Sequence, residues 1–372
     1  MLKTYQYRLY PNKTQEAQMN SYLALSCRVY NALLEFLQEE YEQHGKSYSK
    51  FDKVSLVDQW RRENKCLQVL SSAMNRDIAH RVHLAYDAFF RRVKAGEKPG
   101  FPKFKKARYY RSFGVRQWGN CKILKDGQNG KIRLWDLGEV RCWFHRPLEG
   151  KLKTWTVRKT PTNKWYISFC VEVAEQKTAE TGKAVGIDMG ISSFIATSDG
   201  ELMGQVDVLR QNLAELKRLQ RAVSRKKKGS SRRKEAVLQV ARLHERVANQ
   251  RSWIHHNVAR SLLERYDLVV VEDLQIKNMM KNHHLALSIS DAAWGNFINI
   301  LSAKADEMGK IVYKVNPRNT SQECSQCGVV VAKTLSDRVH DCPECGLVID
   351  RDVNAAVNIL QRGLIGEEKL SA

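Results

Sequence analysis

Two cysteine pairs near the end of the chain constrain its folding more than any other feature. The pairs are Cys324-x-x-Cys327 and Cys342-x-x-Cys345, separated by fourteen residues and each followed at once by a glycine. This spacing is typical of a structural zinc ribbon, in which four thiolates hold one Zn²⁺ tetrahedrally. We expect the glycines to allow a sharp turn that points backbone N–H groups at sulfur, which a Cβ would hinder. The alternative is two disulfides or four ordinary buried thiols.

Three acidic residues stand at the ends of predicted elements. Apolar strands are predicted within Ala184–Gly190 and Tyr266–Leu274, and they end in Asp188 and Glu272. The third acid, Asp352, follows the last cysteine pair and precedes a predicted helix of small residues. Buried strands that each end in an acid suggest a nuclease site beside the ribbon. For each acid alone, a solvated strand end is the alternative.

Four motifs around these residues resemble those of the TnpB proteins, which insertion sequences encode and which are relatives of the type V CRISPR effectors. The motifs are GIDMG at 186–190, VEDL at 271–274, NTSQ at 319–322 and DRDVNAA at 350–356. The resemblance covers nearly the whole chain. It implies a RuvC-type, RNase H-like nuclease with Asp188, Glu272 and Asp352 as its catalytic acids, Asp352 rather than Asp350 being the third.

The resemblance further implies an RNA-guided DNA endonuclease that cleaves double-stranded DNA next to a short target-adjacent motif. Its partners would be a guide RNA from the end of the element and the DNA target, with base pairing carrying the sequence information. Three adjacent carboxylates raise one another's pKa unless cations lie among them, and hard oxygen ligands favour Mg²⁺ or Mn²⁺. Two such ions would serve phosphodiester hydrolysis, and one Zn²⁺ would be structural.

Other functions remain open at this point. A guided DNA-binding repressor without cleavage should show a damaged acid triad, whereas this chain keeps all three acids. A transposase of the same fold would have glutamate as its third acid and no ribbon before it. An unguided, structure-selective nuclease is compatible with the same residues.

The order of elements predicts an α+β multidomain chain. Residues 1–12 and 109–180 are expected to form a wedge domain, a β-barrel interrupted by a helical recognition lobe at 13–108. Residues 183–372 are expected to form the RuvC-like nuclease domain, with the zinc ribbon inserted at 318–348. Three consecutive antiparallel strands should open this domain.

The charge of the chain predicts a polyanionic partner. Lys plus Arg number 62 against 40 Asp plus Glu, a net charge of +22, and each phosphate that a cation neutralises releases counterions. A solubility surface is the alternative. Basic residues concentrate at 91–111, beside aromatic residues that could stack on bases, and at the tip of a helical hairpin predicted over 208–252. Candidate nucleic-acid contacts are Arg225, Lys226, Lys227, Lys228, Arg232, Arg233, Lys103, Lys105 and Arg338.

The remaining features predict a protein of the cytoplasm that does not bind membranes. The longest apolar runs fall short of the roughly eighteen residues that span a bilayer, and the first residues do not form a secretory signal. The five other cysteines are expected to be reduced core residues. We do not expect His255 and His256 to bind metal, because neighbouring side chains on a helix point in different directions.

Overall fold

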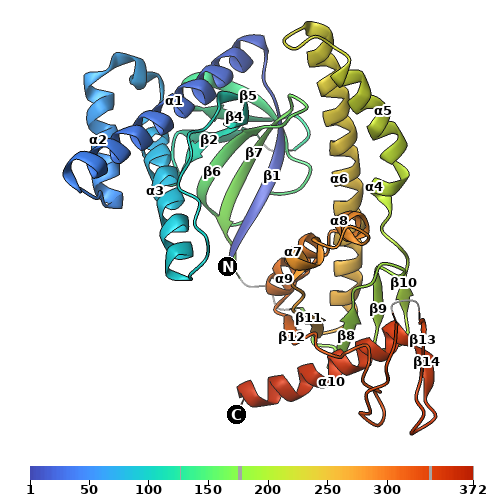
Figure 1. Ribbon diagram of the computed structural model, residues 1–372. Coiled ribbons are helices and arrows are strands. Elements are labelled where there is room, and N and C mark those ends of the chain that lie inside the picture. The colour runs from blue at the N-terminus through green and yellow to red at the C-terminus, as the bar shows by residue number, and fades with distance from the viewer. Residues whose placement is uncertain (126, 175–177, 335–336, 372) are drawn as a thin grey trace. The chain divides into compact units, whose positions relative to one another are not determined.

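The computed structural model describes residues 1–125, 127–174, 178–334 and 337–371, and the chain forms two compact units, Met1–Ala174 and Glu175–Ala372 (Figure 1). Among the described residues, the helices are too short or too polar to cross a bilayer.

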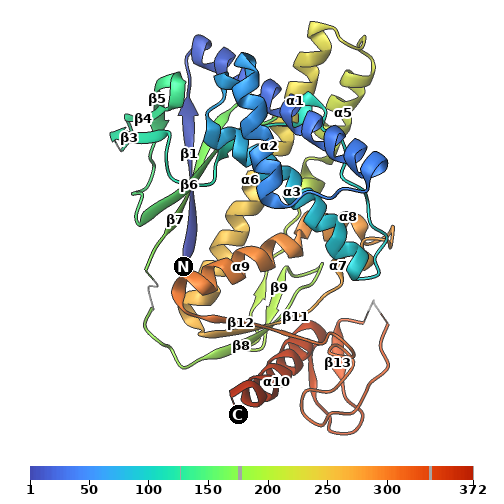
Figure 2. The same ribbon diagram turned by 90° about the vertical axis from the view of Figure 1, so that its left-hand side faces the viewer.

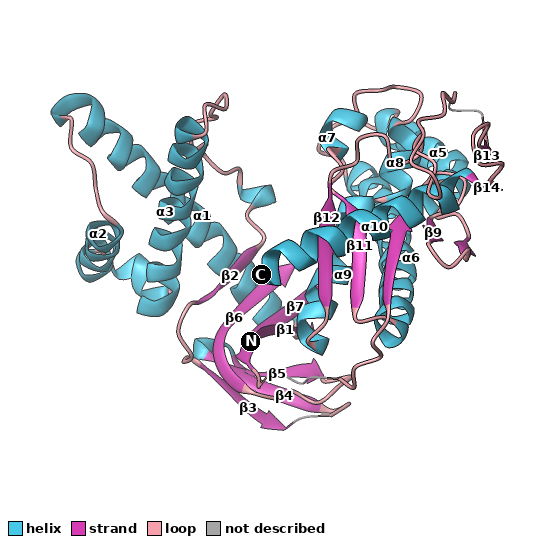
Figure 3. Cartoon of the chain, turned by 90° about the horizontal axis from the view of Figure 1, so that it is seen from below, coloured by secondary structure: helices cyan, strands magenta, loops and turns pink. Residues whose placement is uncertain are grey.

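The first unit is built on a seven-stranded sheet in the order β2-β6-β7-β1-β5-β4-β3. Its strands are β1 (Leu2–Tyr10), β2 (Ser112–Val115), β3 (Cys121–Lys125), β4 (Gly130–Leu134), β5 (Gly138–Trp143), β6 (Lys151–Lys159) and β7 (Trp165–Glu172). The first strand lies at the centre, and its alternating Tyr5, Tyr7 and Leu9 are buried, as the sequence predicts. The predicted barrel takes the form of a curled sheet with β2 and β3 at its edges (Figure 3).

Helices pack on this sheet and share its core. They are α1 (Lys13–His44), α2 (Lys50–Glu63) and α3 (Ser72–Lys94), which lie beside one another (Figure 2), with short 3₁₀ turns η1 (Lys65–Val69), η2 (Ala107–Tyr109) and η3 (Trp135–Leu137). Asn12 caps α1, since its side chain accepts the N–H of Gln15 at 2.8 Å while the Gln15 side chain accepts the N–H of Asn12. The Tyr22 ring of α1 meets Phe113 of β2 edge-on at 5.6 Å.

The second unit contains a five-stranded sheet in the order β10-β9-β8-β11-β12. Its strands are β8 (Ala184–Asp188), β9 (Ile195–Thr197), β10 (Leu202–Met203), β11 (Leu268–Glu272) and β12 (Ile311–Val315). The three antiparallel strands predicted for the start of this half are present, and β11 and β12 run parallel to β8. A separate two-stranded sheet pairs β13 (Val339–Asp341) with β14 (Val348–Asp350).

Helices cover both faces of the five-stranded sheet. They are α4 (Val208–Gln211), α5 (Leu213–Ser224), α6 (Ser231–Arg265), α7 (Ile276–Met279), α8 (Ala286–Ala292), α9 (Trp294–Met308) and α10 (Arg351–Ser371). Val269 and Val271 of β11 belong to the core formed with α6 and α9, whereas Val270 packs with Ile359 of α10. Burial on both faces explains why this strand is apolar without alternation.

The hairpin of α5 and α6 differs in extent from the prediction. The second helix continues to Arg265, past the predicted end at Ser252, because Ala259 and Leu262 extend its buried stripe. Ser230 caps this helix, since its hydroxyl accepts the N–H of Arg233 at 3.2 Å. The connecting tip is therefore limited to residues 225–230.

Helix α10 packs directly against the backbone of the sheet that it crosses (Figure 3), because glycines stand at the points of contact. A Cβ on Gly186 of β8 would stand 2.1 Å from the carbonyl oxygen of Ala356, and a Cβ on Gly363 would stand 2.4 Å from Val270. Neither position leaves room for a side chain. The contact at Gly186 brings the first turn of α10 to the end of β8.

We predict that Gly186→Ala destabilises the second unit by about 2–3 kcal/mol, because the helix backbone must move away from the strand. Gly204→Ala is the matched control, since a Cβ there meets open space. Calorimetric melting of the two variants measures the difference, and equal melting temperatures would contradict the close contact.

Candidate metal sites

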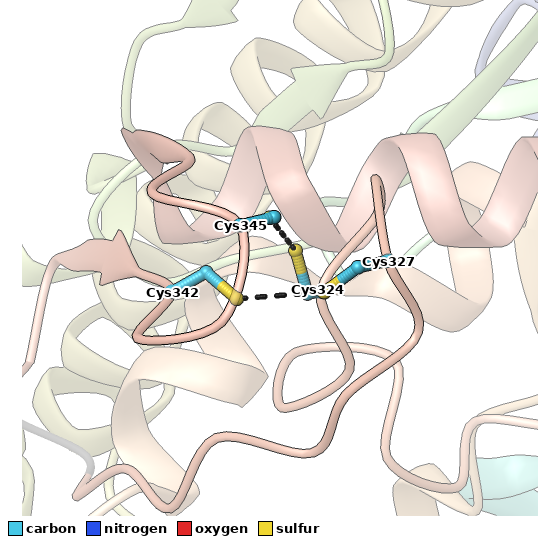
Figure 4. A group of neighbouring side chains, drawn as sticks. All are labelled: Cys324, Cys327, Cys342 and Cys345. Carbon is cyan, nitrogen blue, oxygen red and sulfur yellow. Dashed lines mark hydrogen bonds between the residues drawn. The ribbon is translucent and has the colours of Figure 1, made fainter.

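The four cysteines of the two pairs come together, as predicted (Figure 4). Their Sγ atoms all lie within 4.8 Å of one another, and two of the sulfur pairs, Cys324 with Cys345 and Cys327 with Cys342, are 3.5 Å apart. A disulfide requires about 2.05 Å, so the thiols are free. Four converging sulfurs fit one tetrahedral Zn²⁺, and they leave no position for a catalytic water.

The glycine after each pair is required by backbone conformation. Gly328 and Gly346 have φ angles of +79° and +72°, and each donates its N–H to the carbonyl of the first cysteine of its pair at 2.9 Å. A Cβ at either glycine would meet open space. A Cβ would therefore hinder the turn through the left-handed φ itself and not by meeting a neighbouring atom.

Hydrogen bonds to sulfur favour the thiolate form of Cys324. Burial raises the pKa of Cys324, but the N–H groups of Cys327 and Gln326 outweigh it, so that the pKa falls to about 5. The buried His340 beside it acts in the same direction. His340 was not predicted, because a single histidine outside the cysteine spacing gives no signal of its own.

Two of the three acids lie side by side at one edge of the sheet. Strands β8 and β11 pair in parallel with Ile187 opposite Val271, and Asp188 and Glu272 are the next residue on each strand. The carboxyl ends of neighbouring parallel strands meet at the same edge. Sequence alone suggested these acids individually, and the strand pairing brings them together.

The third acid reaches this edge from the first turn of α10. A Cβ on Gly190, two residues beyond β8, would be 3.5 Å from Asp352 Oδ2. Asp350 has a different role, since its Oδ1 accepts the N–H groups of Asp352 at 2.8 Å and Val353 at 3.2 Å. Asp350 therefore caps the helix, and Asp352 faces the end of β8.

The electrostatics of these acids show that they are crowded. Burial raises the pKa of Asp188 well above its usual value, and the charges of Glu272 and Asp352 raise it further. Burial also raises the pKa of Glu272, although Thr320 donates a hydrogen bond to it. A cation among these acids would favour the ionised form of Asp188, and a donor set of oxygens fits hard divalent ions.

An arginine of the ribbon loop stands beside the acids. Arg338 Nη1 donates to Ser192 Oγ at 2.9 Å, and this oxygen lies 3.5 Å from Asp352 Oδ2. The predicted contact residue Arg338 is thus exposed and linked to the acid group through Ser192. Ser192 was missed, because a lone serine in a short loop has no distinguishing pattern.

The other predicted nucleic-acid contacts lie away from the acids in the sequence. The side chains of Arg225, Lys227, Lys228 and Arg232 are exposed at the tip of the α5–α6 hairpin, and Lys226 is half-buried. Arg233 instead turns back into the hairpin, where its Nη1 donates to Val223 O at 2.8 Å and Lys226 O at 3.1 Å. Val223 is in the last turn of α5 and Lys226 lies just beyond the helix, so Arg233 ties the start of α6 to the end of α5.

The basic segment before β2 is also largely exposed. Lys103 and Lys105 are on the surface, and the backbone N–H of Lys105 donates to Asn31 Oδ1 of α1 at 2.8 Å. Tyr110 is buried and packs in the core. Phe101, Phe104 and Tyr109 remain exposed and are able to stack.

His255, at which we expected no metal, lies in the core of the second unit. Its ring is buried and stacks on Phe194, and its nitrogens lie 3.0 Å from Ala292 O and 3.1 Å from Asn296 Nδ2. This histidine is a satisfied core residue.

Three families match segments of the chain. Residues 168–283 match the family described as "Probable transposase" (OrfB_IS605), residues 294–359 match "Cas12f1-like, TNB domain", and residues 1–46 match "Helix-turn-helix domain". The last segment consists here of β1 and the single long helix α1. The second match covers the cysteine ribbon.

Similar proteins extend over almost the full length. A "Putative RNA-guided DNA endonuclease" of Streptomyces pristinaespiralis is 32% identical over 372 residues, covering 97% of this chain and 89% of the relative. "Putative RNA-guided DNA endonuclease InsQ" of Escherichia coli K12 is 31% identical over 384 residues, covering 97% and 92%. The cryo-EM structure of a Cas12f1-sgRNA-target DNA complex matches with a TM-score of 0.62 at 15% identity, covering 94% of this chain and 82% of that one.

The structural match shows the fold class of this chain. The chain has the mixed α+β fold of the Cas12f1 chain in that complex, and it carries the same type of ribbon domain. Identity above 30% over nearly the whole length gives the family: the chain belongs to the TnpB (OrfB) family of insertion sequences. The resemblance seen in the four motifs is thereby confirmed.

We predict one zinc ion per chain, retained in Cys66→Ser and lost in Cys324→Ser. Cys66 is exposed and outside the ribbon, so it is a matched control for the loss of a thiol. Elemental analysis of the purified protein measures the stoichiometry. Equal zinc content in the two variants would contradict the assignment.

We predict that Asp188→Asn raises the melting temperature of the zinc-loaded protein at pH 8 in the absence of other divalent ions. The folded pKa of Asp188 lies above its unfolded value, so ionisation destabilises the fold increasingly as pH rises from about 4 through the folded pKa. The increase in melting temperature of Asp188→Asn over the wild type should therefore become smaller as pH falls toward 4. Asp350→Asn, which keeps a capping side chain, is the control, and a lower melting temperature for Asp188→Asn at pH 8 would contradict the account.

Proposed function

We propose that this chain is an RNA-guided DNA endonuclease that cleaves double-stranded DNA next to a short target-adjacent motif. The observation that carries the proposal is the meeting of Asp188, Glu272 and Asp352 at one edge of a sheet in a chain of the TnpB family. Both near-full-length relatives bear the corresponding description. Such an enzyme would act in the cytoplasm, on nucleic acid.

The strand arrangement supports a RuvC-like nuclease domain at residues 183–372. Three antiparallel strands followed by two parallel ones, with a two-stranded ribbon inserted at 318–348, fit this assignment. We further assign 1–12 and 109–180 to a wedge domain and 13–108 to a recognition lobe. These boundaries follow the change from curled sheet to helices within the first unit.

The three acids would hold two Mg²⁺ or Mn²⁺ ions. The chemistry that such ions would supply is activation of an attacking water and stabilisation of the leaving oxygen, with a 5′-phosphate and a 3′-hydroxyl as the expected products. The chain itself sets the carboxylates in place through β8, β11 and α10. Asp188 must release any proton that its raised pKa retains before it can act as a ligand.

Basic side chains would hold the nucleic acid. Arg338 would contact a phosphate beside the acids, and its hydrogen bond to Ser192 next to Asp352 supports this proposal. The exposed cations of the hairpin tip, together with Lys103 and Lys105, would contact backbone elsewhere, and the net charge of +22 suits a polyanion. The intact acid triad favours cleavage over guided repression.

We predict that protein expressed with the DNA flanking its gene copurifies with one abundant RNA. This RNA should end in variable sequence from beyond the element, because that part would pair with the target. Sequencing of the bound RNA is the measurement. Heterogeneous cellular RNA would instead support an unguided nuclease.

We predict that Asp188→Ala lowers the cleavage rate by about 1000-fold or more, about 4 kcal/mol of activation free energy, while DNA binding changes little. Asp350→Asn is the matched control and should cut at nearly the wild-type rate, because asparagine is an equally good helix cap. Cleavage of a matched plasmid and a binding assay give the two readouts. Normal cutting by Asp188→Ala would show that the site is misassigned.

A further inference from the structure

Glu272 is held by a residue of the segment that leads into the zinc ribbon. It is only 7% exposed, and the hydroxyl of Thr320 donates a hydrogen bond to its Oε1. Among the described residues, Oε2 has no hydrogen-bond donor. Thr320 is itself 4% exposed, so the contact is shielded from water and fixes one carboxylate oxygen while the other stays available.

The backbone around Thr320 is shaped to deliver this hydroxyl. Asn319 has a φ angle of +59°, a left-handed conformation that asparagine tolerates better than most residues. Its carbonyl accepts the N–H of Gln322 at 3.0 Å and of Glu323 at 2.9 Å. This tight turn lies directly before Cys324, the first ligand of the ribbon, so the folded ribbon limits how far Thr320 can move.

The same segment is fastened to α10, the helix that carries Asp352. Asn358 Nδ2 donates to Thr320 O at 2.9 Å and to Glu323 O at 2.8 Å. Asn354 donates to Glu323 O at 2.7 Å, and its Oδ1 accepts the N–H of Ser325 at 2.9 Å. Both asparagines are buried. One helix thus holds Asp352 directly and Glu272 through Thr320.

We propose that Thr320 is a positioning residue for Glu272, which transmits the folded state of the zinc ribbon to the divalent-cation site. The inference rests on the proposed function, because it assumes that Glu272 is a cation ligand. The ribbon then has a role besides its own folding. It holds in place the hydroxyl that orients one of the three acids, so loss of zinc weakens cation binding at a site that contains no cysteine.

Two substitutions distinguish the effect of the Thr320 hydroxyl from the effect of the side chain's shape. Thr320→Val keeps the volume and removes the donor, while Thr320→Ser keeps the donor and removes a methyl group. Thr197→Val is a control for the loss of a buried threonine hydroxyl, since Thr197 is fully buried and its hydroxyl accepts the N–H of Glu201 at 3.0 Å. Asp188→Ala defines the background of Mn²⁺ bound elsewhere.

The full chain, purified with its RNA, is titrated with Mn²⁺. The concentration of free Mn²⁺ is read from its electron paramagnetic resonance signal. The Mn²⁺ sites that the wild type has and Asp188→Ala lacks are assigned to the three acids. We expect Thr320→Val to raise the dissociation constant of these sites about tenfold or more, in the range usual for partners of metal ligands. Thr320→Ser and Thr197→Val should stay within about threefold of the wild type, and zinc content should be unchanged in all.

Two results would overturn the proposal. Wild-type affinity in Thr320→Val would show that the hydroxyl does not position Glu272, and weak binding in Thr320→Ser would show that packing matters instead of the donor. If Asp188→Ala binds as much Mn²⁺ as the wild type, the acid site itself is misassigned and the proposed function fails with it. The first two results leave that function standing.

Discussion

The contact between α10 and β8 brings the third acid, Asp352, to the other two. A helix normally stays far enough from a sheet for side chains to fill the gap, but Gly186 lets the backbone at Ala356 approach the strand directly. The first turn of the helix then meets the end of β8, so Asp352 reaches the edge where Asp188 and Glu272 already face each other across paired strands. Without this approach, the third acid would lie farther from the other two.

The crowding of the acids has an energetic cost that the rest of the second unit must offset. Burial and mutual repulsion raise the pKa of Asp188, which destabilises its ionised form. The unit compensates with apolar burial on both faces of β11 and with the hydrogen bonds that Asn354 and Asn358 provide to the chain entering the ribbon. Bound cations would remove the repulsion, so stability and cation binding should be linked.

Sequence patterns predicted the features whose physical basis is local. The cysteine spacing and the apolar strands ending in Asp188 and Glu272 each depend on a few consecutive residues. Roles that depend on distant parts of the chain were missed. Ser192 and His340 gave no signal, and the NTSQ motif did not reveal that Thr320 contacts Glu272, because these contacts form only when separate segments meet. Arg233 was predicted as a nucleic-acid contact, and its side chain in this structure donates to carbonyls at the end of α5.

The central claim is that three carboxylates from distant segments form one divalent-cation site. Anomalous diffraction from crystals of the protein soaked in Mn²⁺ tests it most directly, because the signal locates manganese without reference to activity. The account predicts peaks for two ions among Asp188, Glu272 and Asp352, and a separate zinc peak among the four cysteines. Manganese bound elsewhere, with these carboxylates empty, would contradict it.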